Sequence, residues 1–171
     1  MTDPRLIAVC DAGPLIHLDE VECLDLLGEF EVWVSPAVWH EVELHRAQAF
    51  SHSGVSFHYR VPEQPAQPGL LVLRTTLLLD LGEFEALTLM AEVPQALFLT
   101  DDSAARLAAQ YLGYRVHGTI GILLRAIRRG LRTPGDVIAV LESLPMRSSL
   151  HIRPGLLKEI IEETRTLYHL E

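Results

Sequence analysis

The stretch from Leu81 to Asp102, LGEFEALTLMAEVPQALFLTDD, decides the fold. Its first half has apolar residues at helical spacing, and the apolar run at 96–99 is typical of a buried strand. This run leads through Thr100 to Asp101 and Asp102, and another helical pattern follows at once. In open parallel sheets, ligands bind at the carboxyl ends of the strands. The stretch therefore predicts an α/β fold with an acidic site at one edge of its sheet.

The rest of the chain alternates in the same way. Short apolar runs predict further strands at 6–10, 32–34 and 114–117. Helical patterns lie between and after them, at 15–27, 36–45, 103–112, 118–130, 134–144 and 154–168. Strands that alternate with helices are typical of βαβ units. We therefore predict a three-layer α/β/α sandwich with a mainly parallel sheet.

The chain has 171 residues, which is enough for one domain with its own core. Prolines and glycines interrupt the pattern at about 46–69, where we expect an irregular insertion with a short edge strand at 55–61. The apolar segment 70–79 fits either a core helix or part of a self-association surface. Residues from about 134 to 171 are expected to form a C-terminal helical extension of the same domain.

Composition narrows the classes of protein. A net charge of −9 argues against broad, non-specific binding of nucleic acids, although a local basic strip remains compatible with it. No apolar run reaches the roughly 18 residues that span a bilayer, and the N-terminus does not resemble a signal peptide. Cys10 and Cys23 lie in apolar patterns, so we expect buried, reduced thiols. These features predict a cytoplasmic protein with no membrane partner.

Carboxylates stand at four separate strand–helix junctions. Each has a structural explanation when taken alone, because carboxylates cap helices and are stabilised near helix N-termini. Together, in a parallel sheet, such junctions can converge at one end of the fold. The residues concerned are Asp11, Glu41, the pair Glu83 and Glu85, and the pair Asp101 and Asp102. This set predicts cation binding or acid–base chemistry.

Other catalytic patterns are absent from the sequence. There is no G-x-S-x-G elbow, no G-x-G-x-x-G and no Walker A loop. His40, Glu41 and His45 approximate the zinc motif H-E-x-x-H, but the second histidine comes one residue too late. On a helix the two imidazoles would point about 140° apart, so they cannot share a zinc ion.

A basic stripe follows one helical face, at Arg125, Arg128, Arg129 and Arg132. It has two interpretations. Cations near a helix C-terminus are stabilised by the helix dipole and can simply be solvated. Alternatively, the stripe binds phosphate groups or an acidic partner.

Five segments in order resemble PIN domains, in the branch of small prokaryotic proteins related to VapC toxins. They are VCDAGPLI, SPAVWHEV, LGEFEALTL, LTDDSAARLAAQYLG and VHGTIGILLRAIRRG, and they cover roughly residues 7–130. The resemblance implies an α/β/α sandwich and an acidic cluster that holds Mg²⁺ or Mn²⁺ for cleavage of single-stranded RNA. It also implies a possible role as the toxin of a toxin–antitoxin pair, with an antitoxin protein as partner, and a homodimer.

The resemblance assigns roles to individual residues. The catalytic set implied is Asp11, Glu41, Glu85 and Asp102, with Asp101 as the competitor of Asp102. Metal ligands are expected among Asp11, Asp102, Asp101 and Glu85, and nucleic-acid contacts at Arg125, Arg128, Arg129 and Thr119.

One position departs from the family pattern. PIN domains often have Ser or Thr two residues after the first aspartate, where this chain has Gly13. A hydroxyl is therefore missing, and Thr119 is a candidate to replace it. The departure keeps a second hypothesis open, in which the protein is a catalytically silent PIN fold that binds proteins or nucleic acids.

Overall fold

The computed structural model describes residues 5–170. Five strands form one sheet in the order β3-β2-β1-β4-β5, and every neighbouring pair is parallel. The strands are β1 (Leu6–Cys10), β2 (Phe30–Val34), β3 (Ser56–Tyr59), β4 (Leu97–Leu99) and β5 (Arg115–His117). The predicted strands are confirmed, and the sheet that we predicted to be mainly parallel is entirely so.

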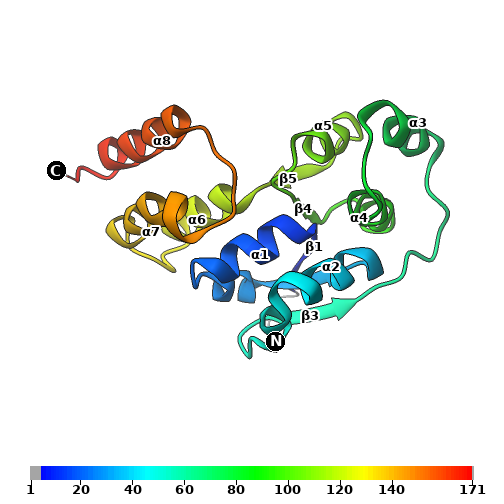
Figure 1. The fold of residues 1–171 in the computed structure, drawn as a ribbon, viewed down its shortest axis with the longest axis horizontal. Coiled ribbons are helices and arrows are strands. Elements are labelled where there is room, and N and C mark those ends of the chain that lie inside the picture. The colour runs from blue at the N-terminus through cyan, green and yellow to red at the C-terminus, as the bar shows by residue number, and fades with distance from the viewer. Residues whose placement is uncertain (1–4, 171) are drawn as a thin grey trace.

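Helices cover both sides of this sheet. Figure 1 shows α4 and α5 on one side and α1 and α6 on the other, while α2 packs against both α1 and α4. The helices are α1 (Ala12–Glu20), α2 (Pro36–Arg46), α3 (Pro68–Leu77), α4 (Leu81–Glu92), α5 (Ser103–Tyr111), α6 (Thr119–Arg128), α7 (Pro134–Arg147) and α8 (Pro154–Leu167). The described residues also contain two 3-10 helices, η1 (Leu24–Glu29) and η2 (Ala47–Ser51). This arrangement confirms the three-layer α/β/α sandwich.

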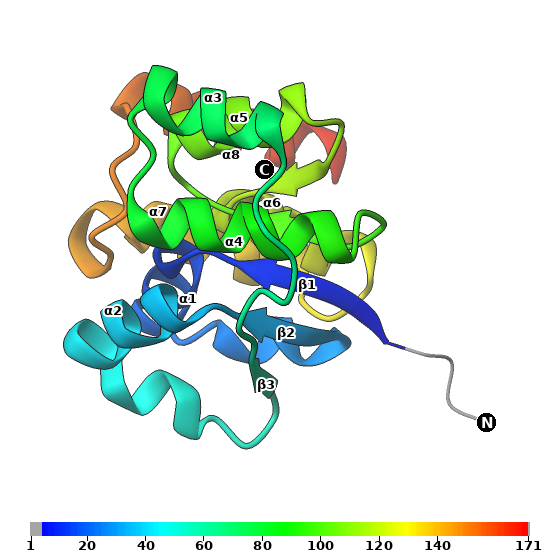
Figure 2. The same ribbon diagram turned by 90° about the vertical axis from the view of Figure 1, so that its right-hand side faces the viewer.

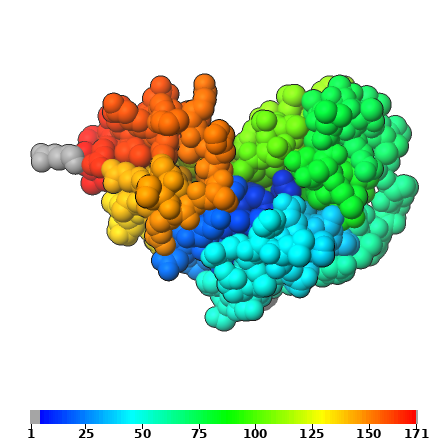
Figure 3. All heavy atoms as spheres, in the orientation of Figure 1, coloured from blue at the N-terminus to red at the C-terminus, as the bar shows by residue number. Residues whose placement is uncertain are grey.

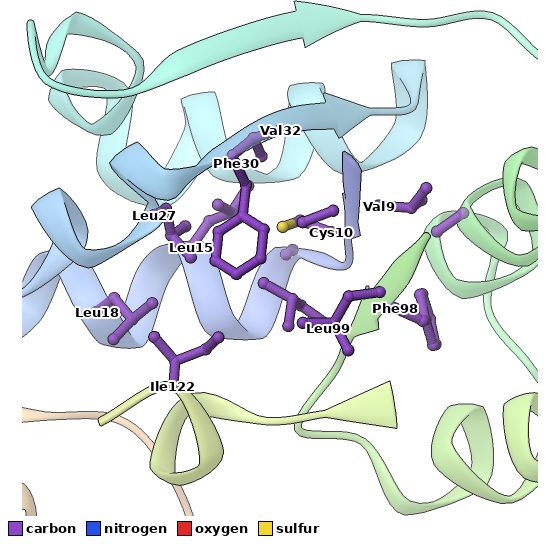
Figure 4. Close-up of a cluster of buried hydrophobic side chains, with 14 of the residues drawn as sticks. Val9, Cys10, Leu15, Leu18, Leu27, Phe30, Val32, Phe98, Leu99 and Ile122 are labelled. Carbon is purple, nitrogen blue, oxygen red and sulfur yellow. The ribbon is translucent and has the colours of Figure 1, made fainter. Parts of the chain in front are cut away.

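The core lies between the sheet and α1 and continues under α4 and α6. In Figure 4, Phe30 of β2 and Leu99 of β4 lie with Leu15 of α1 and Ile122 of α6 in one buried cluster. Cys10 of β1 belongs to the same cluster, and both cysteines are buried free thiols. The strands have apolar residues on both faces of the sheet, so each face must be covered by helices. The three layers are therefore a consequence of the sequence.

The irregular insertion contributes the edge of the sheet. The short edge strand predicted at 55–61 is confirmed as β3, which pairs with β2, and the chain then reaches α3. In α3, Leu70 is the buried residue, whereas Leu71 and Val72 are 50% and 64% exposed. The turned view shows α3 beside α5, at the opposite end of the molecule from β3 (Figure 2). The segment 70–79, whose class was open, is therefore a surface helix rather than a core helix.

The C-terminal helices stand to one side of the sandwich. Helix α7 packs against α6, and α8 packs against α7 (Figure 1). The connection between α7 and α8, residues 148–153, is held at its start by Glu20 of α1, whose Oε2 accepts hydrogen bonds from Ser148 Oγ (2.9 Å) and Ser149 N (2.7 Å). Figure 3 shows the surface hollowed between this C-terminal part and the part formed by α4 and α5. None of the helices within 5–170 is long and apolar enough to cross a membrane.

Candidate active site

A pocket of about 300 Å³ lies at the carboxyl edge of the sheet. Its floor is the junction of β1 and α1, and residues from α2, α4, the end of β4 and the 148–153 connection form its walls. Six carboxylates line it: Asp11, Glu41, Asp80, Glu83, Asp101 and Asp102. The structure therefore brings the predicted strand–helix junctions together, and we call this cavity the acidic pocket.

Asp11 occupies the centre of the floor. It directly follows β1 and is the N-cap of α1, and its Oδ1 accepts the amide of Ala12 at 2.9 Å. Its other oxygen, Oδ2, accepts the hydroxyl of Thr100 at 2.8 Å. Asp11 is only 7% exposed, so it is a cap and a pocket residue at once.

Thr100 connects the first aspartate with the second. Its hydroxyl donates to Asp11 Oδ2 and accepts the amide of Asp102 at 3.1 Å, and Thr100 itself is completely buried. Asp102 is the N-cap of α5, where its Oδ1 accepts the amide of Ala105. Asp11 thus receives a hydroxyl hydrogen bond from Thr100, although position 13 has no hydroxyl.

Asp101 has a different environment from Asp102. Its Oδ1 accepts the amide of Thr119 at 2.7 Å, and its Oδ2 accepts the Thr119 hydroxyl at 2.6 Å. The same Oδ2 lies 2.8 Å from Nδ1 of His17. Because an ionised carboxylate can only accept, Nδ1 of His17 is the donor and its Nε2 is left free. Asp101 therefore joins α1 to α6.

Thr119 was the candidate for the replacement hydroxyl, but its hydrogen bonds go to Asp101. It is fully buried, and both its amide and its hydroxyl are bound to Asp101. It does not hydrogen-bond Asp11, so it is not the replacement hydroxyl. Its predicted contact with nucleic acid stays a prediction.

Glu83 lies in the acidic pocket at the start of α4. Asp80 and Glu83 form a capping box, in which Asp80 Oδ1 accepts the amide of Glu83 (2.8 Å) and Glu83 Oε2 accepts the amide of Asp80 (2.9 Å). Glu83 is 8% exposed. The sequence placed Glu83 beside Glu85 in the acidic set, but it did not single out Asp80. The D-x-x-E spacing before an apolar run was the available signal.

Glu85 lies on another side of α4. Its Oε2 accepts the amide of Ala37 at 2.8 Å, in the first turn of α2. That bond satisfies one of the amides that a helix N-terminus leaves without an internal partner. Glu85 therefore braces α4 against α2, and its predicted role as a metal ligand and catalytic residue stays a prediction.

Glu41 faces the pocket from α2. Gly82 of α4 lies against this part of α2: a Cβ at position 82 would be tight against Val38 Cγ2 at 3.3 Å but in ordinary contact with Glu41 Oε2 at 3.7 Å. Burial raises the pKa of Glu41, and the charge of Asp80 raises it further against the opposing effect of His45.

The pocket concentrates negative charge without protein cations to balance it. Burial raises the pKa of Asp11 to about 6; hydrogen bonds from Thr100 and Ala12 oppose this rise, and the charges of Asp80 and Glu41 add to it. Burial also raises the pKa of Glu83 to about 8, with added repulsion from Asp80, Asp102 and Asp11. Within 5–170, no lysine or arginine forms an ion pair with any of these five carboxylates.

The donor set matches a hard divalent cation. Carboxylate oxygens are the ligands of Mg²⁺, which binds few of them directly and keeps several waters. Among residues 5–170, no three His, Cys, Asp or Glu side chains are grouped tightly enough to hold a metal ion by themselves. A cation would thus be bound by one or two carboxylates, for which Asp11 and Asp102 are the candidates, and through water by the others.

The predicted basic stripe has a structural role. Arg125 and Arg129 of α6 both pair with Glu29 of η1, at 3.6 and 2.9 Å. Arg132 pairs with Asp25 of η1 at 2.6 Å. These bonds fix η1 against α6, and none of the four arginines lines the acidic pocket. Contacts of Arg125, Arg128 and Arg129 with nucleic acid stay predictions.

Comparison with known proteins decides the family. The sequence profile of a family described as a PIN domain matches residues 7–166, which is nearly the whole chain. The chain belongs to the PIN-domain family. The matched range includes the predicted insertion and most of the C-terminal extension. PIN domains are generally nucleases, and they typically use divalent metals.

A solved structure has the same fold. It is a PilT N-terminus domain protein from the hyperthermophilic archaeon Sulfolobus solfataricus. The TM-score is 0.53 at 17% sequence identity, and the similarity covers 71% of this chain and 94% of that one. At this identity the likeness concerns the fold alone. A search of curated proteins gave no match.

Proposed function

We propose that this PIN-domain protein is an endoribonuclease that cleaves single-stranded RNA with Mg²⁺ or Mn²⁺. The observation that carries the proposal is the acidic pocket, where Asp11 and Glu83 are buried beside further carboxylates without a balancing protein cation. Burying carboxylates in this way destabilises a fold unless they are paired or bind a cation. A bound divalent ion would activate a water molecule and stabilise the departing oxygen of a phosphodiester.

The protein's own residues prepare this chemistry. Thr100 holds Asp11 and Asp102 in fixed positions, so their carboxylates do not need to reorganise when a cation binds. In Glu83, Oε2 is occupied by the amide of Asp80, which leaves Oε1 as the atom able to accept or release a proton. The raised pKa of Glu83 allows it to carry that proton near neutral pH.

The test is cleavage of a labelled single-stranded RNA in the presence of Mn²⁺. Asp11→Asn keeps the shape of the side chain and an acceptor for the α1 cap, but it removes the charge that would hold the cation. We expect the wild type to cleave and Asp11→Asn to be inactive while its melting temperature is unchanged or higher. Asp136→Asn, at an exposed position of α7, is the matched control and should cleave normally. Cleavage by a well-folded Asp11→Asn protein would contradict the proposal.

A binding module is the second candidate. Two observations favour it: position 13 has no hydroxyl, and no ready-made group of three metal ligands exists within residues 5–170. The same assay separates the two functions, because a binding module would shift the mobility of the RNA in a gel and leave it intact with Mn²⁺.

We also propose partners for this protein. Helix α3 packs against α5, and both helices carry exposed apolar residues: Leu71 and Val72 on α3, Leu107 and Tyr111 on α5. Such exposed apolar side chains are suited to a homodimer. Light scattering should then give a particle of twice 19.1 kDa, and a monomer would contradict the dimer. A role as the toxin of a toxin–antitoxin pair in the cytoplasm would be supported by an adjacent reading frame that encodes a small DNA-binding protein.

A further inference from the structure

A second cavity, of about 280 Å³, adjoins the acidic pocket. The two share Asp101, Leu150 and His151, so one continues into the other. Its polar lining outside the shared residues comes from Arg106 of α5 and His117 of β5, and its apolar lining from Ile120, Ile152 and Leu156. We call it the Arg106 cavity. It lies just below the roughly 300–1,000 Å³ range of small-ligand sites, so it could hold only a small group.

Arg106 brings a positive charge to this cavity, which Asp101 also lines. Its Nη2 donates to the carbonyl of Thr100 at 3.2 Å, and within residues 5–170 it forms no ion pair. A guanidinium has five N–H donors, so the others remain available. The bond to Thr100 also fixes the guanidinium relative to Asp11, which accepts the hydroxyl of the same residue.

His117 shows that the surroundings of the cavity are electropositive. Burial lowers the pKa of His117, and the charges of Arg128, Arg125, Arg106 and Arg115 lower it further. The chain as a whole carries a net charge of −9. Arg106 therefore places a fixed cation directly beside the acidic pocket, and a cation attracts anions.

Two glycines keep the cavity open. A Cβ at position 118 would meet Oδ1 of Asp101 first and would lie 2.9 Å from Nη2 of Arg106, and a Cβ at position 121 would lie 2.9 Å from Nδ1 of His117. Any larger residue would therefore displace Asp101, Arg106 or His117. A side chain at either position would also occupy part of the space beside them.

We propose that the Arg106 cavity binds the nucleotide adjacent to the phosphodiester held in the acidic pocket. Arg106 and His117 contact its phosphate, and Ile120 and Leu156 pack against its base or sugar. The guanidinium of Arg106 matches a phosphate, the apolar part of the lining matches a base, and the position beside the acidic pocket matches a polynucleotide chain. This inference rests on the proposed function. It places the RNA contact at the opening between α5, α6 and α8 and not at the arginine stripe that the sequence predicted.

The experiment measures binding separately from cleavage. Asp11→Asn protein is titrated into a short, fluorescein-labelled oligouridylate, and the anisotropy is followed at several salt concentrations. We expect Arg106→Gln to weaken binding about tenfold or more, since it removes a charge-assisted hydrogen bond. The slope of log affinity against log salt should fall by about 0.7, as for one lost phosphate contact on a single strand. Arg106→Lys should keep the slope but bind more weakly than the parent.

Two further variants test whether the effect is specific to the Arg106 cavity. Arg5→Gln removes the same charge at the opposite edge of the sheet, before β1, and should leave affinity and slope unchanged. Leu156 is 41% exposed on the far wall, so Leu156→Glu places an anion in the cavity with little risk to the core. It should weaken binding much more than Leu156→Gln, even if Arg106→Gln fails to fold.

The outcomes distinguish the two proposals. Binding that depends on Arg106 and Leu156, in a protein that never cleaves RNA, would support the cavity and contradict the nuclease. Cleavage that depends on Mn²⁺, with affinity indifferent to Arg106→Gln and Leu156→Glu, would overturn the cavity and leave the nuclease. Absence of any binding to the oligouridylate by the parent protein would overturn the cavity as well.

Discussion

Thr100 makes two side-chain hydrogen bonds in the acidic pocket, and each reaches a different aspartate. The hydroxyl donates to Asp11 and accepts from the amide of Asp102. Since Thr100 is completely buried, no water can replace the hydroxyl on either side. The position of one carboxylate is therefore coupled to the position of the other.

Thr100→Val should damage both stability and activity. It keeps the shape of the side chain but leaves the oxygen of Asp11 and the amide of Asp102 without partners, which costs about 1–3 kcal/mol. Chemical denaturation measures this loss, and Mn²⁺-dependent cleavage of RNA should fall at least tenfold. Thr88→Val is the matched control, because the Thr88 hydroxyl bonds only to the carbonyl of Phe84 in its own helix. Equal effects of the two variants would refute the coupling.

The hydroxyl of Thr100 also marks a limit of sequence reasoning at this scale. Asp11 could be placed correctly because an aspartate that ends an apolar strand has few other positions available to it. Its hydroxyl partner comes from a position 89 residues further along the chain. A local sequence pattern compares only nearby positions, such as Gly13 two residues after Asp11. It cannot reveal a contact that only the pairing of β1 with β4 creates.

Helix α4 holds two glutamates that have different surroundings. Glu83 lies in the acidic pocket, while Glu85 reaches the first turn of α2. Two residues apart on a helix means about 200° of rotation, so the two side chains cannot face the same way. The sequence predicted the helix and its carboxylates correctly. It could not supply the rotation of the helix about its axis, which depends on packing against α2 and α5.

Exchanging each glutamate for glutamine should separate their roles. Glu83→Gln keeps an acceptor for the amide of Asp80 and, above about pH 8 where Glu83 is ionised, removes one of several repelling charges. At such a pH the metal-free protein should melt at a higher temperature, and cleavage should be strongly reduced. Glu85→Gln keeps an acceptor for the amide of Ala37, so both properties should change little. Thermal melts and the RNA assay check this. A larger loss of cleavage in Glu85→Gln than in Glu83→Gln would instead identify Glu85 as the catalytic residue.

The arginines at the end of α6 also show what the sequence cannot predict about charged side chains. The prediction that the four arginines share one helical face is wrong in part, because α6 ends at Arg128, Arg129 is its C-cap and Arg132 lies beyond the turn at Gly130. Three of them are nevertheless used to bind Glu29 and Asp25 of η1, which lie about a hundred residues earlier in the chain. Periodicity shows that charges share a face, but the tertiary fold determines which face meets solvent and which meets another carboxylate.

For the whole molecule, the acidic pocket links stability to pH. The pKa of Asp11 rises from 3.8 to about 6 and that of Glu83 from 4.5 to about 8, so the folded state holds these protons more tightly than the unfolded state. Stability is greatest below the unfolded values and declines as pH rises through the folded ones. The loss from Asp11 alone is on the order of 3 kcal/mol.

Urea unfolding of the metal-free protein at about pH 5 and about pH 8 measures this decline. The wild type should be less stable at the higher pH, and Asp11→Asn should show a smaller difference, because one of the two titrating carboxylates is gone. Added Mn²⁺ should restore stability at the higher pH in the wild type only, since it binds the folded state with its carboxylates ionised. Identical pH profiles of wild type and Asp11→Asn would contradict the burial of Asp11 as a charged group.

The central claim is that the acidic pocket holds a divalent cation, and anomalous scattering from a crystal soaked in Mn²⁺ tests it most directly. We predict an anomalous peak beside the carboxylates of Asp11 and Asp102, facing Glu83, that disappears from crystals of Asp11→Asn. An acidic pocket without an anomalous peak, in crystals whose pocket is open to solvent, would contradict the claim.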